Sequence, residues 1–183
     1  MGGPSRISAP TWDPAGMAKR AIVELDKDGD GKLSMEELDA APGLKYCAKQ
    51  LDTDGDGSLS QDEIKARISL YQKMKVGLTA FECTVLYNKR PLVGAKVRLV
   101  PEPFLGDVIK PLESVSKKGG QVGFAAEGIN MSVVPIGMYR VEITSTDVEI
   151  PDKYNVNTTL GVEVSAVTDP YHQGPVVFQL KKK

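Results

Sequence analysis

Two acidic stretches of this chain have the residue types and spacing to hold a metal ion. They read DKDGDGKLSMEE at 26–37 and DTDGDGSLSQDE at 52–63, and each has aspartate at positions 1, 3 and 5, glycine at position 6 and glutamate at position 12. An ion of calcium's size takes six to eight oxygen ligands, which short aspartates on one side and a bidentate glutamate on the other can supply. The spacing therefore predicts two calcium loops.

The remaining ligands would come from positions 7 and 9. Glycine at position 6 allows a sharp turn, so the carbonyl at position 7 can face the ion, and the serine at position 9 usually acts through a water. The predicted metal-binding residues are Asp26, Asp28, Asp30, Lys32, Ser34 and Glu37 in the first loop and Asp52, Asp54, Asp56, Ser58, Ser60 and Glu63 in the second. Carboxylates gathered this closely repel one another without a cation, so calcium binding is expected to be coupled in part to folding of the loops.

Helices must position these loops. Apolar residues recur at helical spacing before each loop, and Asp13-Pro14 reads as an N-cap followed by the first helical residue. After each loop, Ser34 to Glu37 and Ser60 to Glu63 match the Ser-x-x-Glu capping box. Each closing glutamate therefore has two possible tasks, to cap a helix or to ligate an ion.

The helices that follow the two loops, here called the exiting helices, are expected to differ in length. Pro42-Gly43 should end the first exiting helix after about one turn, whereas the second should run over about 61–75 with an apolar face. The linker that follows is short, so we expect the helix around 64–74 to pack on the β-sandwich that the C-terminal part should form.

At each diagnostic position the loops resemble the EF-hand family, and this resemblance implies that Leu33 and Leu59 pair across a short antiparallel ribbon. The short interval between the loops and the few methionines favour a compact, static calcium module over a sensor that opens a Met-rich groove. A dockerin-like cohesion module is a further alternative, but glutamate at both twelfth positions fits an ordinary EF-hand better.

From residue 78 onward the pattern changes to strand-like alternation punctuated by glycine and proline. Some seven short strands predict a β-sandwich, with Lys117–Gly120 as a hairpin turn. The expected strands lie near 81–87, 95–100, 113–116, 121–125, 138–144, 160–164 and 176–180.

The predicted fold class is therefore α+β in two domains: a compact EF-hand pair, then an all-β immunoglobulin- or transthyretin-like sandwich. The boundaries are a disordered N-terminus at 1–11, the paired EF-hand domain at 12–75 and the sandwich at 76–183. Because each part should have its own core, we expect calcium removal to lower the melting temperature of the helical part by several degrees or to unfold it, while the sandwich persists.

A second resemblance concerns this C-terminal part. Segments 87–99, 135–141 and 178–180 look like transthyretin-like, carboxypeptidase-regulatory-like domains, and 150–160 resembles small exported proteins and lipoproteins of planctomycete-type bacteria. The resemblance implies a binding or scaffold role. It also implies export to the periplasm, the cell surface or the medium, a possible lipid anchor in the precursor, and a protein or cell-surface polysaccharide as partner.

Composition narrows the function classes. With 24 acidic and 23 basic residues, a net charge of −1 and scattered lysines, nothing favours nucleic acid, and no apolar run is long enough to span a membrane. One histidine, His172, has no second imidazole to complete a metal or triad set, so we expect no enzyme. Cys47 and Cys83 are interpreted as two buried thiols, with an interdomain disulfide as the alternative.

The sequence therefore indicates a non-catalytic, exported module in which two calcium ions stabilise and orient the sandwich. The alternative is a calcium sensor or buffer that the sandwich anchors. Affinity would separate them, at about 10⁻⁴ to 10⁻³ M for an extracellular structural site and about 10⁻⁷ to 10⁻⁵ M for a sensor.

Overall fold

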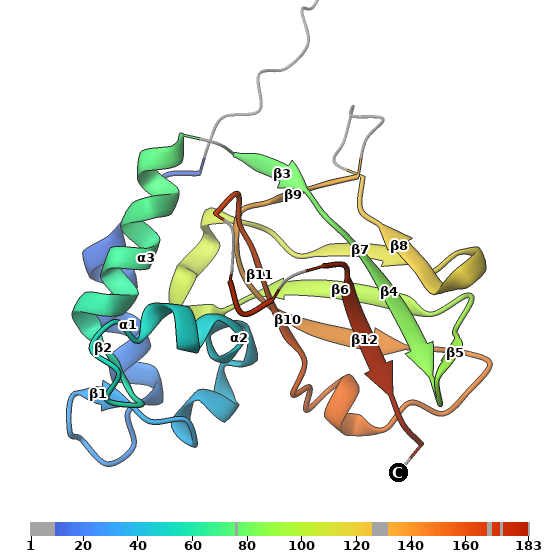
Figure 1. The fold of residues 1–183 in the computed structure, drawn as a ribbon, viewed down its shortest axis with the longest axis horizontal. Coiled ribbons are helices and arrows are strands. Elements are labelled where there is room, and N and C mark those ends of the chain that lie inside the picture. Colours follow the sequence, from blue (N-terminus) through green and yellow to red (C-terminus); the bar gives the residue numbers. More distant parts are fainter. Residues whose placement is uncertain (1–9, 76, 126–131, 168–169, 173, 183) are drawn as a thin grey trace, which may run out of the picture.

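The structure is a computed structural model that describes residues 10–75, 77–125, 132–167, 170–172 and 174–182. Helices form one side of the molecule and strands the other, with α2 between the outer helices and the strands (Figure 1). The predicted disorder of residues 1–11 concerns, apart from 10 and 11, residues outside the described ones. None of the described helices has the length and apolar character needed to cross a membrane.

The helical part carries both loops. Its α-helices are α1 (Pro14–Leu25), α2 (Pro42–Leu51) and α3 (Gln61–Met74), with a 3₁₀ turn η1 (Glu37–Ala40). As predicted, Asp13 caps α1 by accepting a hydrogen bond from Gly16 N at 3.0 Å. Trp12 is buried with its ring 5.2 Å from that of Tyr71, so the start of α1 is fixed on α3.

The exit of the first loop differs from the prediction in detail. The exiting segment is 3₁₀ rather than α and ends at Ala40, after about one turn as predicted, but Pro42 and Gly43 also begin a new helix, α2. Proline at the first helical position loses no hydrogen bond, because that N–H has no partner within the helix, and it restricts Ala41 to a non-helical conformation.

The strands form two larger sheets and two short pairs. Antiparallel order β11-β10-β6-β7 makes one sheet, and β12-β4-β5, with β8 also on β4, makes the other. Strands β4 and β12 are parallel, with Val85 opposite Phe178. The bounds are β3 (Leu78–Ala80), β4 (Glu82–Tyr87), β5 (Arg90–Pro91), β6 (Lys96–Pro101), β7 (Leu112–Val115), β8 (Gln121–Gly123), β9 (Val133–Pro135), β10 (Gly137–Thr144), β11 (Gly161–Val164) and β12 (Val176–Leu180).

The predicted strands are all present, but one connection was wrong. Lys117–Gly120 does not close a hairpin, because β7 pairs with β6 and β8 pairs with β4 in the other sheet. The segment is a corner between sheets, in which Ser116 Oγ accepts from Ala95 N and donates to Leu92 O. Strands β3, β5 and β9 were not predicted, and each is too short for alternation to show.

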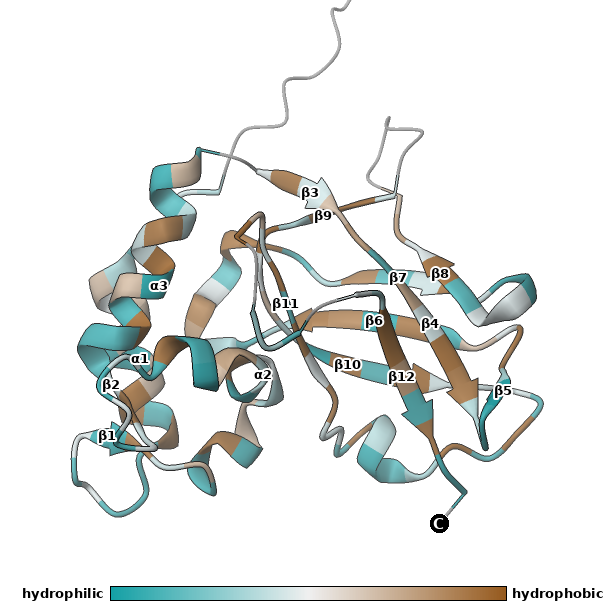
Figure 2. Ribbon diagram, viewed as in Figure 1, coloured by the Kyte–Doolittle hydropathy of each residue, from teal (hydrophilic) through white to brown (hydrophobic). Residues whose placement is uncertain are grey.

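Buried side chains of the helices and of both sheets belong to one contiguous cluster. Hydrophobic residues follow the strands and one face of each helix, whereas the loops at the lower left are hydrophilic (Figure 2). The boundary at 75/76 stays a prediction, since no separate cores mark it. Helix α2 makes the closest approach to the sheet: a Cβ on Gly161 of β11 would lie 1.9 Å from Pro42 O, and one on Gly43 would lie 2.6 Å from Tyr139 N.

Candidate metal centres

Both loops have the turn conformation that their glycines permit. Gly31 and Gly57 have φ of 85° and 86°, a left-handed conformation that other residues adopt only with strain. The first aspartate of each loop accepts two backbone hydrogen bonds across the turn. Asp26 accepts from Gly29 N at 2.7 Å and Gly31 N at 2.9 Å, and Asp52 accepts from Gly55 N at 2.7 Å and Gly57 N at 3.0 Å.

The loops are paired through a short ribbon, β1 (Lys32–Leu33) and β2 (Leu59–Ser60). Leu33 lies opposite Leu59, as predicted, and both side chains are buried. This pairing places the two candidate centres side by side on the surface and joins them through the ribbon.

Carboxylate oxygens gather in each loop, but the sets differ. In the first loop Asp26, Asp28 and Asp30 each have an oxygen within 4.8 Å of the others, and in the second the group is Asp52, Asp54 and Glu63. The first group thus lacks Glu37, and the second lacks Asp56. In each loop, three of the four predicted carboxylate ligands lie together, and the fourth, Glu37 in the first loop or Asp56 in the second, hydrogen-bonds to other groups.

The closing glutamates cap the segments that follow. Glu37 accepts from Lys27 N at 2.6 Å and from Ser34 N and Oγ, each at 2.8 Å, and these hydrogen bonds, the first above all, lower its pKa to about 2. Glu63 has the same set, with Thr53 N at 2.7 Å and Ser60 N at 2.9 Å. Burial opposes the shift of Glu63, yet these bonds lower its pKa on balance.

This donor set suits calcium. All the clustered groups are carboxylates, which hard divalent cations prefer, and the three of the second loop include the glutamate that can bind in bidentate fashion. The lowered pKa of Glu37 and Glu63 keeps both anionic at neutral pH, as ligation requires. The backbone N–H groups of Lys32 and Ser58 donate to Asp30 and Asp56, at 2.8 and 2.9 Å.

Asp56 is engaged by a residue of the other loop. Its Oδ2 accepts a hydrogen bond from Lys32 Nζ, so the predicted carbonyl ligand of the first loop reaches with its side chain into the second. Neither the motif nor its spacing indicates this contact, because it depends on the register of the ribbon.

Sequence reasoning also missed a buried ion pair between α3 and β11. Arg67 Nε donates to Glu163 Oε1 at 2.6 Å, and Arg67 Nη2 to Gln50 of α2 at 2.8 Å; Tyr71 donates to Glu163 as well. The two charged side chains are only 5% and 2% exposed. One signal was present: Arg67 occupies a position of the apolar face that carries Ile64, Ile68 and Tyr71, where a charge requires a partner.

A second buried carboxylate joins α2 to the sheet. Glu102, fully buried after β6, accepts from Gly43 N at 2.7 Å and from Arg140 Nη2 of β10 at 3.1 Å. Burial raises its pKa, although Arg140 and the Gly43 N–H counteract the shift. The two ends of α2 are thus tied to strands, at the start through Glu102 and near the end through Gln50 and the Arg67–Glu163 pair.

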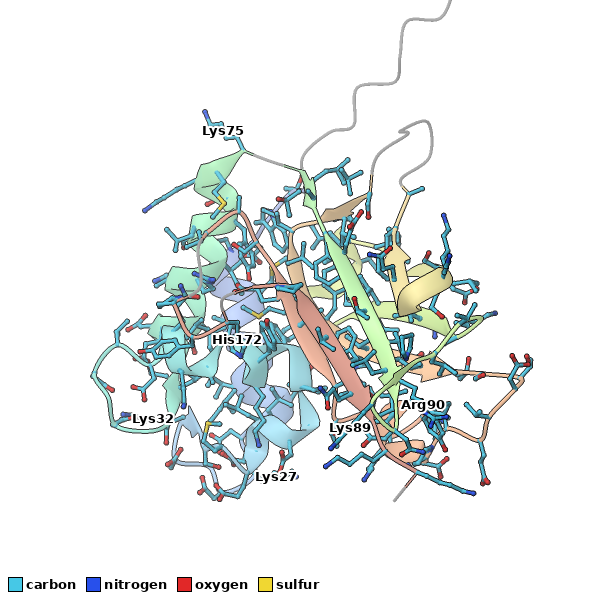
Figure 3. The ribbon with its side chains drawn as sticks, turned by 45° about the vertical axis from the view of Figure 1, so that its right-hand side comes forward. Lys27, Lys32, Lys75, Lys89, Arg90 and His172 are labelled. Atoms are coloured by element: carbon cyan, nitrogen blue, oxygen red, sulfur yellow. The ribbon has the colours of Figure 1, made fainter. Side chains whose placement is uncertain are left out.

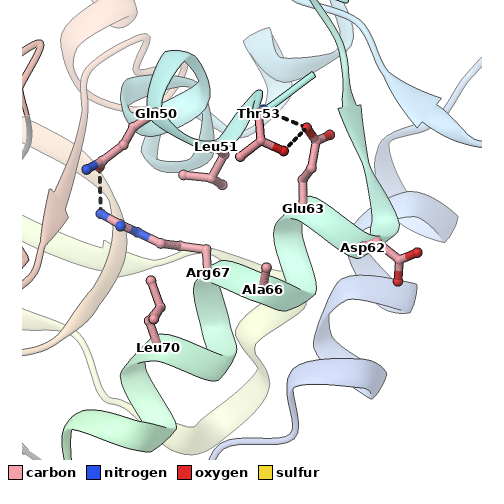
Figure 4. A pocket seen from close by; sticks show the side chains of 8 residues that line it. All are labelled: Gln50, Leu51, Thr53, Asp62, Glu63, Ala66, Arg67 and Leu70. Atoms are coloured by element: carbon pink, nitrogen blue, oxygen red, sulfur yellow. Dashed lines mark hydrogen bonds between the residues drawn. The ribbon is translucent and has the colours of Figure 1, made fainter. Parts of the chain in front are cut away.

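A pocket of about 270 Å³ lies where the second loop meets this ion pair (Figure 4). Glu63 and Thr53 form one end and Arg67 and Gln50 the other, with Leu70 at 39% exposure on the rim. A loop ligand and the buried pair therefore share one surface, one helical turn apart on α3.

The histidine and the two cysteines lie outside the candidate metal centres. His172 is exposed, and its ring stacks on Tyr46 with centroids 3.9 Å apart. Cys47 and Cys83 are both buried thiols, as predicted, and Cys47 Sγ contacts Leu44 O at 3.4 Å within its own helix. Burial raises the pKa of Cys83 to about 12.

Comparison with known proteins gives one family match: the family described as EF hand matches residues 19–40 and 49–69. These segments span both acidic loops and parts of their helices, and they indicate calcium binding there. No curated protein and no solved structure matches the chain.

Proposed function

We propose that this chain is a calcium-binding, non-catalytic module in which two calcium ions hold the helical part in the shape that fits the sheet. The observation that carries the proposal is the pair of loops, each with clustered carboxylates and the required glycine conformation, facing each other across the ribbon. The family match over both loops supports it.

The helices then position the strands. Loop 2 lies between α2 and α3, and these helices reach the sheet through Gly43 to Glu102 and through Arg67 to Glu163. An ion that fixes the angle between these two helices would therefore also fix the positions of Gly43 and Arg67, which contact the sheet. In this proposal calcium stabilises and orients the β part, which serves as the binding or scaffold surface.

The finer assignment of the β part rests on the resemblance of segments 87–99 and 135–141 to transthyretin-like, carboxypeptidase-regulatory-like domains. It is supported by two sheets whose buried side chains belong to one core. With that assignment we propose an exported protein of the periplasm or cell surface. Its partner would be a protein or a cell-surface polysaccharide.

Calorimetric titration with calcium tests the proposal. We expect two ions per chain for the wild type and one for each of the variants Glu37→Gln and Glu63→Gln, because glutamine cannot supply a charged bidentate contact. Asp62→Asn, which alters a 92% exposed side chain next to Glu63, should keep both ions. A single site in the wild type, or zinc displacing calcium, would refute it.

One observation favours the alternative of a sensor. The pocket beside Glu63 has an apolar rim at Leu70, so a movement of Glu63 toward an ion could open it. If calcium changes the fluorescence of a hydrophobic dye and leaves the melting temperature unchanged, the sensor function should replace the structural one. We expect a large change in melting temperature and little change in dye binding.

A further inference from the structure

Lys32 belongs to both candidate centres. Its carbonyl is a predicted ligand of the first loop, and its side-chain ammonium contacts Asp56, a predicted ligand of the second. The pairing of Lys32 with Ser60 across the ribbon directs the side chain there. Figure 3 shows Lys32 on the loop side of the molecule, remote from the sheet.

The charges of the second loop act on this lysine. Asp56 raises the pKa of Lys32, with smaller contributions in the same direction from Asp54 and Glu63. In turn, Lys32 lowers the pKa of Asp56. The ammonium therefore stands in the field of the carboxylates that a second calcium ion would need.

Within the described residues, no ion pair of this kind reaches the aspartates of the first loop. The residue equivalent to Lys32 in the second loop is Ser58, which has no charge to offer Asp30. Accordingly Asp30 is grouped with Asp26 and Asp28, whereas Asp56 is absent from the group of Asp52, Asp54 and Glu63. Two loops with the same side-chain ligands thus differ in how many of their short carboxylates converge.

We propose that Lys32 is a built-in competitor for calcium at the second loop, which makes that loop the weaker site and sets the order of filling. A calcium ion there must draw Asp56 away from the ammonium that it contacts, whereas no ion pair engages the clustered aspartates of the first loop in the part of the chain that the structure describes. This inference rests on the proposed calcium function and adds a residue that determines affinity at one site.

The test follows each loop separately in a calcium titration by NMR. The amides of Gly31 and Gly57 report on one loop each, because they donate to Asp26 and Asp52. In the wild type the Gly31 signal should reach its midpoint at lower calcium than that of Gly57. In Lys32→Gln the Gly57 midpoint should fall roughly twofold to tenfold, as expected for loss of a partly exposed ion pair and a nearby charge.

Two variants serve as controls. Lys32→Arg keeps a cation and should leave the Gly57 midpoint close to the wild-type value. Lys27→Gln removes the same charge from the other side of the first loop (Figure 3), where the side chain has no contact with Asp56, and it should affect Gly31 more than Gly57. High salt should shrink the difference between wild type and Lys32→Gln, since screening weakens exposed charges.

The possible outcomes distinguish failure of the proposed role of Lys32 from failure of the proposed calcium function. If both amides respond to calcium but Lys32→Gln leaves Gly57 unchanged, or shifts it no more than Lys27→Gln does, the role of Lys32 is refuted while the calcium function stands. If neither amide responds in the wild type, the calcium function itself is refuted. An equal or lower wild-type midpoint for Gly57 would also contradict the order of filling.

Discussion

The two acidic loops have the same residue at each predicted side-chain ligand position, yet they end differently. The first leads into the four-residue 3₁₀ turn η1, and the second into the fourteen-residue helix α3. Both closing glutamates make the same capping hydrogen bonds. The loop therefore determines how the exiting helical segment begins. Its length is determined by the residues that follow: Pro42 after the first loop, and the apolar face around Ile64 after the second.

This difference gives the loops different connections to the sheet. The first loop reaches it through α2, whose start lies on Gly161 with almost no side chain between. The second reaches it through α3 and the buried pair of Arg67 and Glu163. The first contact combines a close approach of backbone with a hydrogen bond from Gly43 N to the buried Glu102, and the second depends on the balance of two charges, so the two should respond to different perturbations.

The largest effect should come from breaking the second connection. Arg67→Met leaves Glu163 buried without its counter-charge, which should cost roughly 3–5 kcal/mol of unfolding free energy. Denaturant unfolding measures it, and the matched control is Arg98→Met, whose partner Glu142 lies at 3.0 Å in an exposed pair. That control should lose less than about 1 kcal/mol. Equal losses would show that burial of the pair does not matter.

Removal of calcium should have the next largest effect. At a free concentration of about a hundred times Kd, each site that binds only the folded chain adds roughly 2.7 kcal/mol. The sequence suggested that the sheets would persist after chelation, but the contiguous core leads us to expect that both parts unfold together. Trp12 fluorescence follows the helices and far-ultraviolet dichroism the whole chain; separate transitions would show that the two parts are independent.

A smaller loss of stability, measured without calcium, should distinguish the helical segments that follow the two loops. Glu63→Gln weakens the cap of α3, and we expect a loss of about 1 kcal/mol. Glu37→Gln weakens the same bonds at η1, which has no long helix to lose, so its effect should be smaller. Thermal melts in chelator compare them. A larger loss for Glu37→Gln would mean that η1, rather than α3, carries the coupling to the sheet.

The smallest expected effect is a pH dependence at the first connection. Because the pKa of Glu102 is raised by burial, the folded state holds its proton more tightly than the unfolded state. Its contribution to stability therefore falls as pH rises from about 4.5 through the folded pKa. The stability of wild type relative to Glu102→Gln should thus be greater at pH 4 than at pH 7. A rise with pH would mean that Arg140 and the Gly43 N–H outweigh burial.

Local sequence determined much of this protein. The glycine conformations, the Asp13 cap, the capping box of α3, the matching Ser34–Glu37 hydrogen bonds and the leucine pair of the ribbon all follow from interactions between residues near in sequence or from a motif repeated in it. The strand positions followed from alternation, which the folded chain shows most clearly in β4, β6 and β11, where buried side chains alternate with more exposed ones over much of the strand.

Tertiary structure alone decided the rest, because those features depend on residues far apart in the chain. Lys117–Gly120 could turn back or cross to the other sheet, and only the partner strands settle which. Arg67 and Glu163, 96 residues apart, give no local sign of each other. The contact of Lys32 with Asp56 likewise depends on the ribbon register, so a repeated motif predicted the same ligand positions in both loops, whereas the folded chain groups different carboxylates in each.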